Sequence, residues 1–205
     1  YLPTADLIVC DGIYFGSKYS VLRGMGRPLI GCCPKVDVFN QSREVRSAIF
    51  EELGLPITDH GNLAGLRLRI SGFWNGRAWL RPIFYSYNYS TLFKAPSDFY
   101  PPDFIIPVES MGSVALAAHT DTKVIKETLL PFADYLKRTE YRGMFNVSVL
   151  LTDCVAFIED AYAGFYPDFC DLITEGLDKD QSLSDLLFAL ASSSSSEFSY
   201  SKSYV

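Results

Sequence analysis

Residues 141–168 read YRGMFNVSVLLTDCVAFIEDAYAGFYPD, and this stretch decides the fold. It contains two apolar runs, FNVSVLL and CVAFIE, which are typical of β-strands and are joined by a short Thr-Asp turn. The second run ends in Glu159 and Asp160, and acids at the end of a sheet strand are candidate ligands for Mg²⁺. Adjacent strand residues point to opposite faces, so we expect Glu159 to face a cleft and Asp160 to face away.

A second hairpin is predicted at residues 65–87, GLRLRISGFWNGRAWLRPIFYSY. Apolar and polar residues alternate on both sides of an Asn-Gly pair, which is a strong signal for a tight antiparallel turn. The alternation places the apolar residues of LRLRI on one face of the strand and Arg67 and Arg69 on the other.

The regions around these hairpins predict helices and one loop. Residues 121–140 form an amphipathic pattern that we expect to be one helix bent at Pro131, and residues 182–192 predict a short helix. The proline-rich residues 94–107 predict an extended loop.

The beginning of the chain has a different pattern. Residues 5–11 and 27–33 are apolar runs typical of buried parallel strands, and residues 40–56 predict an amphipathic helix that Gly54 and Pro56 end. The fold class is therefore α/β, with a partial Rossmann-like unit at residues 1–57. The polar break TDHGN leads into an antiparallel sheet with flanking helices at residues 58–190, and residues 191–205 read as a serine-rich linker and the start of a further segment.

Composition excludes some functions. The 205 residues are 48% hydrophobic and 20% charged with a net charge of −6, which disfavours a nucleic-acid backbone binder. No apolar run is long enough to cross a membrane, and the five cysteines have no metal-ligand spacing, so we expect reduced, buried thiols in a cytoplasmic protein. The chain begins at Tyr1 without a signal-peptide pattern and ends at Val205 without a closing signal, so we expect further residues on both sides.

The order of these segments resembles the phosphoribosylamine–glycine ligase family of the ATP-grasp superfamily, and especially its divergent phage-type relatives. The resemblance covers nearly the whole chain, and it lies in pattern more than in identity. The segments that carry it are ADLIVCDGIYFGSKYSVLRGMGRPLIGC, SREVRSAIFEELGLPI, SGFWNGRAWLRPI, ESMGSV, LLPFADYLKRTEYRGMFNVSVLLTDCVAFIE, GFYPD and SLSDLLFALA. It implies an ATP-grasp fold, an ATP-dependent carbon–nitrogen ligase of purine biosynthesis, and bound ATP and Mg²⁺.

Several positions depart from the family. The resemblance places the family's first metal-binding Glu at Arg67, a cation where a cation must bind. Glu159 is kept from the metal-binding segment, but the Asn that shares the metal becomes Ala161 and the phosphate-facing Arg becomes Ala163. The lysine-bearing lid would stand between Ile57 and Gly65, which are nearly adjacent. These losses would remove the charge stabilisation that phosphoryl transfer needs.

Two functions are compatible with this pattern. The first is a catalytically degenerate ATP-grasp protein that needs no cofactor and acts as a scaffold, with a protein partner or a second copy bound through the aromatic-rich residues 73–104. In it, Glu159 is a vestige of the Mg-ATP site that binds metal weakly at most, and Arg67 forms an ion pair with Glu159 in place of the metal. The second is an active carboxylate–amine ligase of changed substrate, of which this chain is an incomplete copy. No residue can be assigned as catalytic from the sequence.

Overall fold

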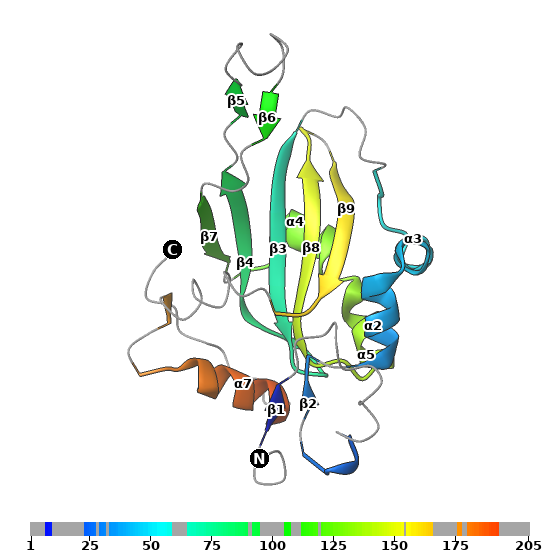
Figure 1. Ribbon diagram of the computed structural model, residues 1–205, viewed down its shortest axis with the longest axis vertical. Coiled ribbons are helices and arrows are strands. Elements are labelled where there is room, and N and C mark those ends of the chain that lie inside the picture. Colours follow the sequence, from blue (N-terminus) through cyan, green and yellow to red (C-terminus); the bar gives the residue numbers. More distant parts are fainter. Residues whose placement is uncertain are drawn as a thin grey trace.

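The structure is a computed structural model that describes residues 7–9, 23–27, 29–31, 33–58, 65–89, 92–94, 105–107, 112–118, 120–153, 155–165, 176–177 and 180–192. It is a mixed α/β fold built on one five-stranded antiparallel sheet with flanking helices, as Figure 1 shows. The predicted fold class is therefore confirmed. The division of the chain at residues 57 and 190 stays a prediction.

The beginning of the chain forms the expected parallel pair. Strand β1 (Ile8–Val9) lies beside β2 (Leu29–Ile30), with Ile8 opposite Leu29 and Val9 opposite Ile30. Ile8 and Ile30 are buried, as expected for strands covered by other parts of the chain. Residues 10–22, which contain most of the expected connection, lie outside the described residues.

The helix predicted at residues 40–56 is present as one helix, and another helix that the sequence did not predict precedes it. Helix α2 (Pro34–Gln41) ends where α3 (Arg43–Glu52) begins, because Ser42 leaves the helical conformation and its hydroxyl oxygen accepts a hydrogen bond from Val45 N at 3.2 Å. A serine that caps the second helix thus interrupts the first. The predicted end of α3 is correct, with Gly54 at a φ of 64°.

The central sheet has the strand order β7-β4-β3-β8-β9, and every neighbouring pair is antiparallel. Both predicted hairpins are present: β3 (Leu66–Trp74) with β4 (Trp79–Tyr89), and β8 (Gly143–Leu151) with β9 (Ala156–Ala163). The first hairpin turns at Asn75, whose side-chain oxygen accepts hydrogen bonds from the backbone of Arg77 and Ala78. Strand β7 (Gly112–Ala118) completes the sheet beside β4.

Two further predictions need correction. The expected bent helix at residues 121–140 is two helices, α4 (Lys123–Thr128) and α5 (Phe132–Arg138), because Pro131 stands immediately before α5 and cannot donate to the α4 backbone. The loop expected at residues 94–107 begins at the last residue of strand β5 (Leu92–Lys94) and contains strand β6 (Ile105–Pro107). These two strands pair with each other above the sheet (Figure 1). Residues 95–104 lie outside the described part of the chain.

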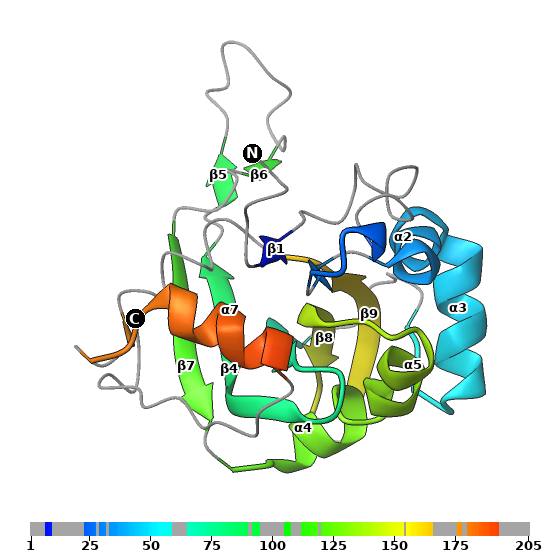
Figure 2. The same cartoon turned by 90° about the horizontal axis from the view of Figure 1, so that it is seen from below.

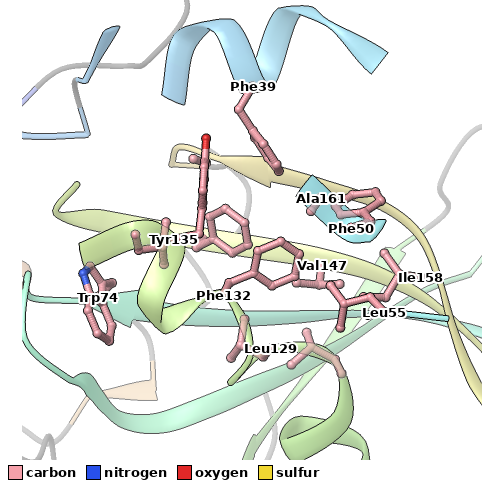
Figure 3. Close-up of a cluster of buried hydrophobic side chains, with 14 of the residues drawn as sticks. Phe39, Phe50, Leu55, Trp74, Leu129, Phe132, Tyr135, Val147, Ile158 and Ala161 are labelled. Carbon is pink, nitrogen blue, oxygen red and sulfur yellow. The ribbon is translucent and has the colours of Figure 1, made fainter. Parts of the chain in front are cut away.

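Each face of the sheet carries its own core. The larger core contains buried side chains of α2, α3, α4 and α5 on one face, and Figure 3 shows Phe39 reaching down toward Phe132, which lies beside Val147 of β8. The smaller core joins β2 and helix α7 (Leu183–Ser192) to the other face, where Ile30 and Leu190 are fully buried. Figure 2 shows α7 crossing the strands β4 and β7, with α4 and α5 beyond them.

The structure tests part of the predictions about membrane spans and about reduced cysteines. Within the described residues, none of the helices has the length and apolarity needed to span a membrane. Cys33 is a buried free thiol that donates to the Thr139 carbonyl at 2.8 Å, as expected for a reduced core cysteine. The other four cysteines, together with His60 and His119, lie outside the described residues.

Candidate functional site

Arg67 and Glu159 meet across the upper half of the central sheet. Strand β8 separates their strands, and Arg67 Nε donates to Glu159 Oε1 at 3.0 Å. The Glu159 side chain is 9% exposed and the Arg67 side chain 57% exposed. The acid is therefore held in a largely dry position by an arginine that still reaches solvent, and the predicted ion pair is confirmed.

The alternation of β3 aims Arg67 as expected. Leu68 packs against the larger core and Ile70 is fully buried within it. Arg67 and Arg69 alternate with these two residues along β3, so both arginines lie on the opposite face of the sheet.

A β-bulge in β9 changes the direction of the two acids. Ser148 of β8 lies opposite Asp160 and the next residue, Val149, lies opposite Ile158, which leaves Glu159 as an extra residue without a partner in the ladder. Ile158 and Ala161 both face the larger core, so the two acids between them both leave that face. The prediction that Asp160 faces away from the site is therefore wrong, and Glu159 lies within β9 rather than at its end.

Both acids line one pocket between α3 and β9, with a volume of about 110 Å³. The described residues around it are Arg43, Arg46, Ser47, Phe50, Ile57, Thr58, Glu159 and Asp160. Pockets for drug-sized ligands and cofactors usually measure about 300–1,000 Å³. The part of this pocket that the described residues enclose is therefore smaller than that range.

Arg46 holds the second acid. Its Nε lies 2.8 Å from Asp160 Oδ1, and its Nη1 donates to the carbonyl oxygens of Phe39 and Asn40 at 3.0 and 2.7 Å. These carbonyls belong to the last turn of α2, so the arginine joins α2, α3 and β9. Asp160 Oδ1 also accepts from Ala161 N at 2.9 Å.

The arrangement does not fit a Mg²⁺–ATP site. Each carboxylate already has an arginine as its counterion, and Mg²⁺ would have to displace both guanidinium groups to be ligated by the two acids. Ala161 and Ala163, which the family resemblance assigns to a metal ligand and a phosphate ligand, are buried in the larger core. Because of the bulge, a side chain at Ala161 points away from Glu159, so asparagine there could not share a metal with it.

Sequence reasoning missed Arg46, Ser47 and Thr58. Arg43, Arg46 and Ser47 have the spacing of one polar helix face, which could have been read from the sequence. This face lies near Glu159 because of the bulge in β9, and no residue type in β9 predicts that bulge. Among the described residues, no group of three or more His, Cys, Asp or Glu side chains is placed to hold a metal ion.

The aromatic-rich residues 73–104 are used in two ways. Phe73, Trp74 and Phe84 are buried in the cores, whereas Tyr87 on β4 is 38% exposed. The first three therefore stabilise the fold and are closed to any partner.

The fold is similar to that of solved ATP-grasp ligases. The D-alanine–D-alanine ligase from Bacillus anthracis superimposes with a TM-score of 0.54 at 11% sequence identity, over 93% of this chain and 79% of the ligase. The structure of that ligase complexed with ATP gives the same TM-score and identity over 92% of this chain. The biotin carboxylase domain of a single-chain bacterial carboxylase gives 0.56 at 10% identity, over 93% of this chain and 52% of that one.

These likenesses show an ATP-grasp-like fold and, at such low identity, the fold alone. The chain spans about half the length of the carboxylase that it matches. No protein-family model and no curated protein sequence matches the chain. The finer resemblance to phosphoribosylamine–glycine ligase stays a prediction.

Proposed function

We propose that the protein is a catalytically degenerate relative of the ATP-grasp ligases, similar in pattern to phosphoribosylamine–glycine ligase, that acts in the cytoplasm as a scaffold. The observation that carries this proposal is the ion pair between Arg67 and Glu159. In this pair the Arg67 guanidinium binds the carboxylate that would bind the metal according to the family resemblance.

Charge supports the proposal. A cation at Arg67 repels a second cation, and at 4 Å two like unit charges repel by about 4 kcal/mol at the effective dielectric of a protein surface. Glu159 is nearly buried, and without a counterion its charge would be costly. The arginine thus stabilises an acid that has lost its metal-binding companions.

The scaffold function needs a protein-binding surface, and we assign it to the sheet edge in and beside residues 73–104. Tyr87 of β4 and Leu116 of β7 are 38% and 48% exposed. Leu116 lies opposite Tyr85, two residues from Tyr87, so the two exposed side chains share one face of the sheet. Substituting Leu116→Lys should abolish self-association measured by light scattering, and an unchanged oligomeric state would remove this surface from the proposal.

Calorimetry with Mg²⁺ and ATP tests the central claim. We expect no saturable heat from ATP at micromolar concentrations, with or without Mg²⁺, in the wild-type protein. The Arg67→Glu variant should likewise bind no ATP, because one restored acid leaves Ala161, Ala163 and the pocket size unchanged. Arg77→Gln, an exposed arginine in the turn after β3, is the matched control for loss of a positive charge.

The alternative outcome is informative. Tight, Mg²⁺-dependent binding of ATP to the wild-type protein would contradict the degenerate function and support an active ATP-dependent carboxylate–amine ligase of changed substrate. ADP release with glycine and a phosphorylated amine as substrates would then support the phosphoribosylamine–glycine ligase resemblance.

A further inference from the structure

A second, larger pocket lies at the other end of the sheet. Arg67 stands near the start of β3, whereas this pocket includes Gly76, which follows the end of that strand. Its volume is about 520 Å³. The described residues that line it come from five parts of the chain: Arg23, Gly26, Arg27, Leu29, Gly76, Lys137, Glu140, Arg142 and Ala191. Figure 1 shows β2 and α7, which contribute or adjoin lining residues, at the lower end of the molecule.

The charge of this pocket is opposite to that of the chain. Four cations and one acid line it, a balance of +3 (4 − 1), whereas the whole protein carries −6. Arg27 and Lys137 have no ion-pair partner among the described residues. Arg23 lies 3.3 Å from Glu140, but both side chains are more than 60% exposed, so this pair is weak and open to exchange.

Arg142 is held in a fixed position at the pocket wall. Its Nη1 donates to the Ala191 carbonyl in the last turn of α7, and its own carbonyl accepts from Gly31 N at 2.6 Å. A Cβ atom at Gly76 would lie 3.0 Å from Arg142 Nε, so glycine in the hairpin turn makes room for the guanidinium. A guanidinium fixed in this way is preorganised to donate two parallel hydrogen bonds to an oxyanion.

Helix ends explain only part of this charge. Lys137 lies in the last turn of α5 and Arg142 caps α7, and cations favour the carbonyl ends of helices. Arg23 also lies at a helix end, because residues 23–24 are helical and a turn follows them, whereas Arg27 stands after that turn and before β2. Cations from three separate helix ends and Arg27 therefore converge on one hollow.

We propose that this pocket binds a small molecule carrying two or more phosphate or other anionic groups. Its volume is within the usual range for small-molecule sites. The cations surround one concavity and do not form a stripe, and the chain as a whole is acidic, which disfavours a nucleic acid as the ligand. The site is separate from Glu159, so it does not depend on whether ATP binds there.

Calorimetry with inorganic pyrophosphate at constant ionic strength tests the proposal. The wild-type protein should give saturable binding, and Arg27→Gln and Lys137→Gln should each weaken it roughly tenfold, the loss expected for one charge-assisted hydrogen bond. Both side chains are exposed, so neither substitution should impair folding. Glu140→Gln should strengthen binding, because it removes the single acid.

Two control variants and one control ligand make the test specific. Arg77→Gln removes an exposed arginine close to the pocket and Glu159→Gln alters the other site, so neither should change pyrophosphate affinity. Sulfate should bind at least tenfold more weakly than pyrophosphate, because it reaches fewer of the four cations. Absence of saturable binding, equal affinity for sulfate, or equal losses in Arg77→Gln would overturn the proposal.

Discussion

At the scale of single residues, one arginine decides what Glu159 can do. In a sheet that leaves an acid only 9% exposed, the ionised carboxylate needs either a metal or a fixed cation. Arg67 supplies the cation from the exposed start of the central strand β3, so the pair stabilises the folded state. The same reasoning applies to Arg46 and Asp160, although Asp160 is half-exposed and its pair should contribute less.

Substituting Arg67→Gln should lower the free energy of unfolding by about 1–2 kcal/mol, because Glu159 keeps its charge in a nearly buried position. Urea unfolding at pH 7 measures this change. Arg77→Gln, with an exposed side chain, should stay within about 0.5 kcal/mol of wild type. In the double variant with Glu159→Gln the loss should be smaller than the sum of the two single losses, and strict additivity would show that the pair contributes nothing.

Asp37 is a buried acid that, unlike Glu159, has no ion-pair partner among the described residues. It lies in α2 with 6% exposure, and neither carboxylate oxygen has a hydrogen-bond partner in the described part of the chain. Burial raises the pKa of its carboxyl above the ordinary value. The folded protein thus binds the proton more tightly than the unfolded chain does, and stability falls as the pH rises from the unfolded pKa through the folded one.

Asp37→Asn should therefore raise the free energy of unfolding by about 1 kcal/mol at pH 7, because burial penalises the charged form of the wild-type carboxyl. The difference should shrink as the pH falls through about 4, because the carboxyl of the unfolded wild-type chain then becomes protonated as well. Urea unfolding at the two pH values measures it, with the exposed Asp134→Asn as control. If Asp37→Asn is instead less stable than wild type at pH 7, and this loss is smaller at pH 4, the carboxylate has a stabilising partner.

At the scale of elements, two helices end in the same motif with different residues. After α3, Gly54 N bonds to Glu51 O and Leu55 N to Phe50 O; after α5, Glu140 N bonds to Lys137 O and Tyr141 N to Leu136 O. Both are Schellman motifs, which need a residue of positive φ. Gly54 provides it at 64° without strain, but Glu140 adopts 56° with a Cβ atom.

Glu140→Gly should stabilise the protein by about 1 kcal/mol, since it relieves the left-handed conformation and loses only an exposed pair with Arg23. Thermal unfolding would show a higher midpoint. The converse substitution Gly54→Ala should lower it by a similar amount. A lower midpoint for Glu140→Gly would mean that the Glu140 side chain contributes more than its backbone costs.

Element type was predictable from the sequence, but element boundaries were less so. The Asn-Gly turn, the glycine after α3 and the alternation around Arg67 are local signals, and each led to the correct structure. The break at Ser42, the separation of α4 from α5 and the bulge at Glu159 depend on what packs against the backbone. The bulge matters most, because it reversed the expected direction of Asp160.

At the scale of the whole molecule, the parallel pair and the sheet share their cores. Ile30 of β2 packs in the smaller core with Leu190, and Phe39 and Phe50 of the first two helices pack in the larger core with Phe132 and Phe145. The sequence pattern separated residues 1–57 from the rest because the continuous apolar runs give way to alternating apolar and polar residues. This pattern does not show which side chains pack together in the folded protein.

We therefore expect a single cooperative unfolding transition. Fluorescence of Trp74 and Trp79 reports on the larger core, and hydrogen exchange of α3 amides reports on the region before residue 58. Both should give the same midpoint in urea. Two separate midpoints would support independent units on the two sides of residue 57.

The central position of β3 has a consequence for how the chain acquires its fold. All nine residues of β3 pair with β8, from Trp74 with Gly143 to Leu66 with Leu151, so the contacts span 69 (143 − 74) to 85 (151 − 66) positions. Pairings this distant form slowly, because a long loop must close first. During synthesis β3 is therefore an exposed edge until residue 151 has left the ribosome, and exposed edges invite aggregation. The two arginines on β3 give that nascent edge a positive charge, which keeps copies apart before either arginine has any role in the finished protein.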